Sequence, residues 1–233
     1  MKIALLGYGK MGKTIEKIAI ERGHDIVIKT SDEDGYDITK ADVAIDFSVP
    51  NAAFFNIVKC FKNGVPVISG TTGWLDNYKK AEAICKEEHG AFIYASNFSL
   101  GVNIFFELNK QLAKMMSKLE SYKVSMEEIH HTQKLDAPSG TAITLAESII
   151  SEHDTYTDWS LLSKKENTIP ISAKRIADVS GTHAVSYTSK TDTITIEHEA
   201  HSREGFALGA VIAAEWLKDK TGVYTMKDVL NIG

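Results

Sequence analysis

Residues Lys2 to Gly12 read Lys-Ile-Ala-Leu-Leu-Gly-Tyr-Gly-Lys-Met-Gly, an apolar run that leads directly into the spacing G-x-G-x-x-G. Apolar residues then recur at helical spacing as far as Gly23, which predicts a helix end. A strand, this glycine turn and a helix form the fingerprint of a dinucleotide-binding fold, in which the second glycine lets the backbone approach a pyrophosphate. The expected cofactor contacts are Gly7, Tyr8, Gly9, Lys10, Met11 and Gly12.

Strands and helices alternate through the next 70 or so residues. Further strands are predicted at 25–29, 41–47, 65–69 and 91–95, with helices at 51–63 and 76–89. This alternation indicates an α/β fold with a parallel sheet and right-handed crossovers. Ligands of such sheets bind at the carboxyl ends of the strands, although each end taken alone is better explained as an ordinary polar turn. The cofactor contacts expected there are Phe47, Gly70, Thr71, Thr72, Ala95, Ser96, Asn97 and Phe98.

The end of the second strand bears on which nicotinamide cofactor is used. An acidic residue there binds the ribose hydroxyls of NAD, whereas a basic residue accommodates the extra phosphate of NADP. Lys29 stands at this position and the first acidic residue, Asp32, comes three residues later. We expect Lys29 to contact the cofactor, with a solvated strand end as an equally good explanation, and the choice between NADH and NADPH stays open.

The pattern changes beyond Asn97. Helices are predicted at 101–117, 141–150 and 205–220, strands at 122–130, 184–189 and 193–200, and a long irregular polar excursion at 154–174. Strands joined by a hairpin indicate a second, more antiparallel unit. The last long helix is expected to return to the first sheet, which needs helices on both faces. We therefore predict a discontinuous dinucleotide-binding domain, residues 1–98 and 209–233, and a central α+β domain, residues 99–208.

The stretch 127–142 concentrates groups suited to acid chemistry on an anion. It reads Glu-Glu-Ile-His-His-Thr-Gln-Lys-Leu-Asp-Ala-Pro-Ser-Gly-Thr-Ala, and the Ser-Gly-Thr opens a helix. Free N–H groups of a first helical turn, here from Ser139 to Thr141, bind carboxylates. Adjacent strand residues point to opposite faces, so His130 and His131 should have separate roles, one as a general acid and the other contacting substrate or structure. Surface histidines beside a capped helix are the alternative explanation.

The composition limits the classes of function. A net charge of −5 over 233 residues argues against a nucleic-acid binder, and the first apolar run is far too short to span a membrane. Cys60 and Cys85 lack metal-site spacing, so we expect free thiols, a cytoplasmic protein and no metal site. The turn Gly70 to Gly73 lacks the P-loop lysine, which disfavours phosphoryl transfer.

Together these motifs resemble the dihydrodipicolinate reductase family over nearly the whole chain. The segments that carry the resemblance are Gly7–Gly12, Gly70–Gly73, Ala95–Ser99, His130–Ala142, Arg175 with Gly181–His183, and Glu197–Phe206. The resemblance implies reduction of 4-hydroxytetrahydrodipicolinate, a small dicarboxylate, to tetrahydrodipicolinate by NADH or NADPH, with loss of water, in the diaminopimelate route to lysine. It also implies a homotetramer assembled through the sheets of the central domain.

The resemblance assigns roles within the histidine stretch. It implies that His130 is the proton donor or acceptor and that Lys134 is a second proton donor. The substrate contacts that it implies are His131, Ser139, Gly140 and Thr141. Two rival functions stay open: a nucleotide-sensing protein that has lost its chemistry, and an amino-acid or sugar dehydrogenase built on the same nucleotide-binding unit.

Overall fold

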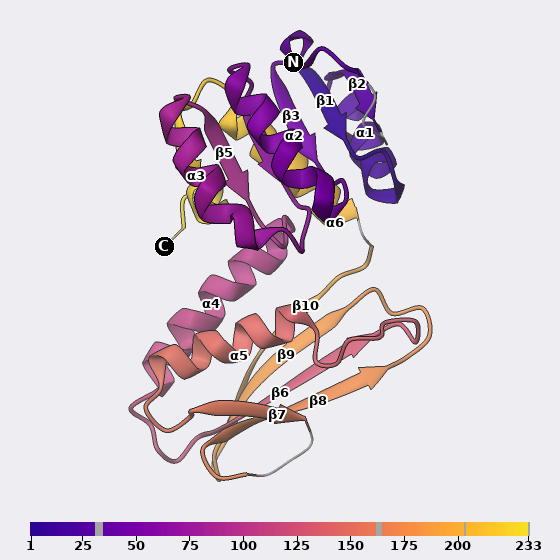
Figure 1. Cartoon of the computed structure of the whole chain (residues 1–233). Coiled ribbons are helices and arrows are strands. Elements are labelled where there is room, and N and C mark those ends of the chain that lie inside the picture. The colour runs from indigo at the N-terminus through magenta and orange to yellow at the C-terminus, as the bar shows by residue number, and fades with distance from the viewer. Residues whose placement is uncertain (31–34, 162–164, 203, 233) are drawn as a thin grey trace. The chain divides into compact units, whose positions relative to one another are not determined.

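The computed structural model describes residues 1–30, 35–161, 165–202 and 204–232. The chain divides into two compact units (Figure 1). One consists of Met1–Asn103 with Glu204–Gly233, and the other of Ile104–Arg203. Helix α4 (Leu100–Met116) begins in the first unit and continues into the second.

The first unit is built on a six-stranded sheet in which every neighbouring pair is parallel. The strand order is β11-β5-β4-β3-β1-β2. The bounds are β1 (Lys2–Leu6), β2 (Asp25–Thr30), β3 (Val43–Asp46), β4 (Val67–Ser69), β5 (Ala91–Tyr94) and β11 (Gly222–Tyr224). The expected parallel sheet is confirmed. Because β2 lies on one side of β1 and β3 on the other, the order reverses where the glycine turn leaves β1, the usual position of a ligand crevice.

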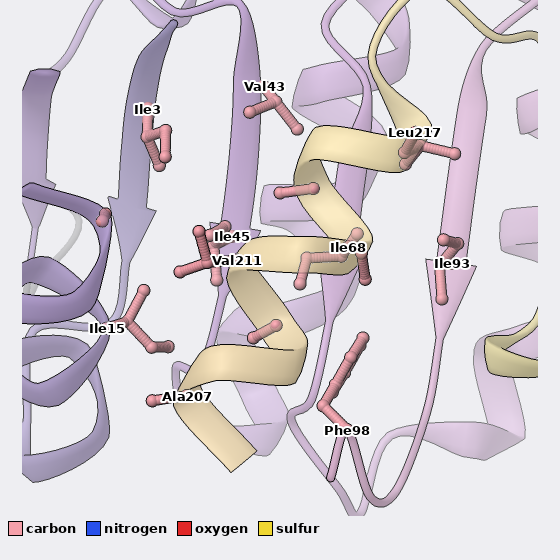
Figure 2. Close-up of a cluster of buried hydrophobic side chains, with 14 of the residues drawn as sticks. Ile3, Ile15, Val43, Ile45, Ile68, Ile93, Phe98, Ala207, Val211 and Leu217 are labelled. Atoms are coloured by element: carbon pink, nitrogen blue, oxygen red, sulfur yellow. The ribbon is translucent and has the colours of Figure 1, made fainter. Parts of the chain in front are cut away.

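Helices cover both faces of this sheet. They are α1 (Lys10–Glu21), α2 (Pro50–Lys62), α3 (Tyr78–Glu87), α6 (Glu204–Leu217) and the short α7 (Met226–Leu230), with 3-10 turns η1 (Ile38–Lys40) and η2 (Leu75–Asn77). Figure 2 shows α6 lying along one face, where Val211 and Leu217 pack among Ile45, Ile68 and Ile93. The expected return of the last long helix to the first sheet is therefore confirmed.

The second unit holds a five-stranded mixed sheet in the order β10-β9-β6-β8-β7. Its elements are β6 (Lys123–His130), α5 (Gly140–Glu152), β7 (Asp158–Leu161), β8 (Thr168–Arg175), β9 (Thr182–Thr188) and β10 (Thr193–Glu199). The hairpin of β9 and β10 is confirmed, whereas β6 and β7 both pair with β8 in parallel.

Three strands, β7, β8 and β11, were missing from the sequence-based prediction. The expected irregular excursion at 154–174 is wrong over most of its length, because it contains β7 and nearly all of β8; its residues 162–164 lie outside the described part. Strand β11 has only three residues. β8 is held by pairing with β6 and β11 by pairing with β5, which both lie far away in the sequence, and β7 pairs with β8. Local periodicity does not reveal such pairing.

Strand β6 carries the pattern that positions the site of the second unit. Its alternate residues Val124, Met126, Glu128 and His130 are all buried. The first two pack in a core with Leu145 and Ile149 of α5. The buried face of β6 is therefore apolar at Val124 and Met126 and polar at Glu128 and His130, toward its carboxyl end. None of the described helices is long and apolar enough to cross a membrane.

Candidate active site

The glycine turn after β1 is closely packed beneath and open above. Gly7 has a φ of +98°, and a Cβ there would collide with the carbonyl oxygen of Phe47 at the end of β3. A Cβ on Gly12 would collide with the Gly7 carbonyl oxygen. Gly9, the N-cap of α1, has no neighbouring atom within 4 Å of its Cβ position. The open backbone at a helix N-terminus suits a pyrophosphate, so these residues fit a dinucleotide.

A buried carboxylate ties the neighbouring strand ends together. Asp46, at the end of β3, is 0% exposed and accepts four hydrogen bonds. The donors are Ser48 Oγ (2.7 Å), Asn56 Nδ2 (3.0 Å), Ser69 Oγ (2.8 Å) and Thr71 Oγ1 (2.8 Å). Burial raises the pKa of Asp46 even though all four hydrogen bonds oppose that shift. Sequence reasoning missed this residue, whose bonds fix the turns after β3 and β4.

Lys29 is engaged within its own unit. Its ammonium lies 2.5 Å from Glu16 Oε1 and 5.2 Å from the centre of the Tyr8 ring. Tyr8 also donates a hydrogen bond to Glu16. The hydrogen bond and charge of Glu16 raise the pKa of Lys29, so the lysine stays charged. This three-residue cluster connects the glycine turn, α1 and the end of β2.

The other predicted cofactor residues differ in accessibility. Lys10, Thr72 and Ser96 are exposed, whereas Met11, Phe47, Gly70, Ala95 and Asn97 are half-buried. The Phe47 ring fills the space that a Cβ on Gly70 would need. Thr71 is buried and accepts the Ser48 N–H at 2.9 Å. Phe98 is 1% exposed, its side chain belongs to the hydrophobic core and its carbonyl faces Gly209, so little of this residue is accessible.

The second unit brings three buried ionisable side chains together at the end of β6. Glu128 Oε2 lies 3.5 Å from His130 Nδ1 and 3.7 Å from His183 Nε2 of β9. The two imidazole rings meet edge to face with centroids 5.0 Å apart. His131, the next residue, follows the end of β6 and is half-buried. Thus the two adjacent histidines have different environments, and only His130 joins the carboxylate.

Arg175 fixes the loop that carries Lys134. From the end of β8 its Nη2 donates to Glu128 Oε1 at 3.1 Å and to the Asp136 carbonyl at 2.5 Å, and its Nε donates to the Lys134 carbonyl at 3.3 Å. The Lys134 ammonium donates to Asp136 Oδ1 at 2.8 Å, and its side chain keeps 23% exposure. The partly exposed Lys134 ammonium therefore lies on a loop that Arg175 connects to Glu128.

The N–H groups from Ser139 to Thr141 at the start of α5 were expected to be free, and the Ser139 N–H is not. The Ser139 N–H donates to Glu128 Oε2 at 3.0 Å and is not free to bind a ligand. The Ser139 hydroxyl accepts the Ala142 N–H as the N-cap and lies 3.0 Å from His183 Nε2. The N–H groups of Gly140 and Thr141 follow at the first turn, where helices leave donors without intrahelical acceptors, and Gly140 has open space beside it.

Burial and hydrogen bonding shift the pKa values of Glu128, His130 and His183 for different reasons. Burial would raise the pKa of Glu128, but hydrogen bonds from Ser139 and Arg175 outweigh it and hold the pKa below its usual value. Burial lowers the pKa of His130, and the charge of Glu128 opposes that shift. Burial, with the neighbouring His130, lowers the pKa of His183 to about 4. At neutral pH the cluster therefore holds a carboxylate anion and a neutral His183.

Sequence reasoning left Glu128, Arg175 and His183 without roles, although all three stand in quoted motifs. The alternation of buried residues along β6 was the available signal for Glu128. The donor atoms of Glu128, His130 and His183 lie close enough together to hold a metal ion. The Glu128 carboxylate already faces the Arg175 cation and the Ser139 N–H, however, and this arrangement satisfies a carboxylate without a metal.

Comparisons with known proteins cover both units. The model of the dihydrodipicolinate reductase N-terminus matches residues 1–98 and that of the C-terminus matches residues 101–230. The chain is 62% identical to the 4-hydroxy-tetrahydrodipicolinate reductase of Christiangramia forsetii over 99% of its own length and 98% of that protein. It is 36% identical to the reductase of the same name from Archaeoglobus fulgidus, over 99% and 100% of the two chains.

A solved structure agrees with the fold. The dipicolinate-bound dihydrodipicolinate reductase of Paenisporosarcina sp. TG-14 matches with a TM-score of 0.77 at 21% identity, and the match covers 97% of each chain. The two family models together match nearly every residue, and the chain is closely similar to a curated relative over its full length. Both findings indicate the same family. The chain belongs to the dihydrodipicolinate reductase family.

Proposed function

We propose that this protein reduces 4-hydroxytetrahydrodipicolinate to tetrahydrodipicolinate with loss of water, in the diaminopimelate route to lysine. The observation that carries the proposal is the His130 to Thr141 block, which presents an acid, a cation and a helix N-terminus in a chain 62% identical to a reductase of this name. The reaction consumes one hydride and one proton for each water released. The protein must therefore bind a hydride donor and supply a proton.

We assign the first unit to the pyridine nucleotide, which supplies the hydride when it is bound. The open backbone at Gly9 would receive the pyrophosphate, and the strand ends after β3, β4 and β5 would line the rest of the cofactor site. The Lys29 ammonium would stand at the adenosine ribose, where a cation suits the phosphate of NADPH. Because Glu16 already compensates that charge, NADH remains a second substrate of the same site.

We assign the second unit to the dicarboxylate and to proton transfer. Lys134 would exchange its bond with Asp136 for a substrate carboxylate and serve as a second proton donor. His131, Gly140 and Thr141 would hold the rest of the substrate, with Ser139 shaping the turn through its backbone and hydroxyl. His130, whose ring is buried beside a carboxylate, would donate the proton. We further propose a homotetramer assembled through the sheets of this unit.

The test is an assay of reduced nicotinamide oxidation with freshly generated 4-hydroxytetrahydrodipicolinate. We expect turnover with both NADH and NADPH, and the two KM values measured side by side decide the preference. Nucleotide binding without oxidation would indicate a sensing protein. Oxidation of simple 2-amino acids with NAD, in place of the expected reaction, would indicate another dehydrogenase. Sedimentation analysis of the same sample tests the tetramer.

A further inference from the structure

We propose that Glu128 is the positioning residue of His130: its carboxylate holds the proton on Nδ1 and stabilises the charged imidazole that donates from Nε2. The inference rests on the proposed function and deepens it, because it names the group that makes His130 an acid. Every residue in the argument belongs to the second unit.

The Glu128 carboxylate is fixed on all sides. Its side chain is fully buried. Oε1 accepts from Arg175 and Oε2 accepts from the Ser139 N–H, so neither oxygen can rotate without breaking a bond. A carboxylate immobilised in this way can define the orientation of a ring that it faces, as the second partner of a catalytic or metal-bound histidine does. Oε2 faces His130 Nδ1 at 3.5 Å.

The His130 ring has one buried nitrogen without another partner among the described residues. Nδ1 is inaccessible to solvent and forms no hydrogen bond within the normal distance. Catalytic hydrogen bonds are often long in a free enzyme and shorten when the substrate binds. The opposite edge of the ring faces the side of Gly181 that carries no side chain, where an added Cβ would stand 3.2 Å from Cδ2 and Nε2. Glu128 is thus the acceptor available to an Nδ1 proton.

The charges around His130 make Glu128 decisive for its protonation. Glu128 faces it along β6, Arg175 from β8, His183 from β9, and Lys134 and Asp136 from the following loop. Burial and the cations Lys134 and Arg175 lower the pKa of His130. The carboxylates oppose them, and Glu128 contributes more than Asp136. Loss of the Glu128 charge would therefore lower the pKa of His130 further.

The competing explanation is that Glu128 only anchors the start of α5 through the Ser139 N–H. The two roles differ in what they do to the pH profile. An acid must be protonated, so kcat falls as pH rises through the pKa of His130. Loss of the Glu128 charge lowers that pKa and moves the alkaline limb of the profile to lower pH. Loss of an anchor alone would lower activity and stability equally at every pH.

The experiment compares Glu128→Gln with Glu127→Gln. Glu127 is the preceding residue of β6, is partly exposed, and pairs with Lys174 at 2.5 Å, so its substitution is a matched control. We expect Glu128→Gln to reduce kcat about 10- to 100-fold near neutral pH and to move the alkaline limb by about one pH unit. The KM for the nucleotide should stay unchanged, and Glu127→Gln should resemble the unsubstituted protein. An unshifted limb in Glu128→Gln overturns the proposal.

A second measurement does not depend on turnover or on any substitution of Glu128. Nitrogen NMR of the unsubstituted protein, with the His130 signals identified by their loss in His130→Asn, reports the neutral tautomer. We expect the proton on Nδ1, facing Glu128, and a proton on Nε2 alone overturns the proposal. An unsubstituted protein that shows this tautomer but no reductase activity would refute the proposed function while leaving the Glu128–His130 pairing in place.

Discussion

At the scale of single residues, Lys134 supplies the lysine cation of the histidine stretch, and 23% of its side chain is exposed. Its ammonium is paired with Asp136, a surface carboxylate whose pKa is held low mainly by that hydrogen bond. A partly exposed pair of this kind contributes little to stability, so the lysine can exchange partners at small cost. Its backbone is nevertheless fixed by Arg175. The arrangement favours a binding role over a structural one.

Replacement of Lys134 with Ala should therefore reduce turnover without harming the fold. We expect kcat/KM for the dicarboxylate to fall about 100- to 1,000-fold, because a charged hydrogen bond and a proton donor are both lost. The Kd for NADH should change less than about twofold, measured by fluorescence titration. Lys174→Ala is the matched control, because Lys174 pairs with Glu127 and is not part of the proposed site. Unchanged turnover in Lys134→Ala would remove this residue from the mechanism.

At the scale of secondary-structure elements, the turn between β1 and α1 contains one glycine that packing requires and another that packing does not require. Gly12 lies where the helix backbone meets the Gly7 carbonyl, so its missing side chain is required for packing. Gly9 has a φ of −82° and open space around it. Its missing side chain serves no packing purpose in the protein itself. The two glycines of one motif therefore differ in function.

The element-scale prediction compares Gly9→Ala with Gly12→Ala. Gly9→Ala should leave the Tm nearly unchanged but weaken NADH and NADPH binding about tenfold or more, since the added methyl group would occupy the pyrophosphate position. Gly12→Ala should destabilise the protein by about 1–3 kcal/mol, because the collision with Gly7 forces the helix away from the strand. Thermal unfolding and nucleotide titration check both variants. Equal affinity in Gly9→Ala and the unsubstituted protein would mean that the pyrophosphate does not lie at this turn.

At the scale of the whole molecule, the buried histidine cluster couples folding to pH. His183 is 6% exposed, and its pKa falls from the usual 6.5 to about 4 on folding. The unfolded chain then binds a proton between these values that the folded protein does not. Stability is therefore full above about pH 6.5 and declines as the pH falls toward 4.

The corresponding prediction concerns His183→Asn. Between about pH 7 and about pH 5 the unsubstituted protein should lose about 2 kcal/mol of unfolding free energy through this residue, and the variant should lack that part of the decline. Urea unfolding at the two pH values measures the difference. The control is His89→Asn, because His89 is exposed and its φ of +53° is one that Asn tolerates. A pH dependence unaltered by His183→Asn would show that this ring titrates normally.

The sequence alone determined the parallel sheet, the glycine turn, the returning helix α6 and the separation of His130 from His131. These features have local causes: apolar periodicity of 2 or 3.6 residues, glycine spacing, and the alternation of faces along a strand. The family followed from the same motifs, because they occur in order along nearly the whole chain.

Only the tertiary structure decided which groups meet. Strands β8 and β11 form by pairing with distant segments, and β7 then pairs with β8. The Asp46 carboxylate accepts hydrogen bonds from three separate segments. Arg175 and His183 lie close to Glu128, although they follow it by 47 and 55 residues in the sequence. The spacing of residues along the sequence does not predict these contacts, because they depend on the register with which the strands pair. The proposed proton donor, His130, was therefore visible in the sequence, whereas the carboxylate that we propose positions it, Glu128, was recognised only in the assembled sheet.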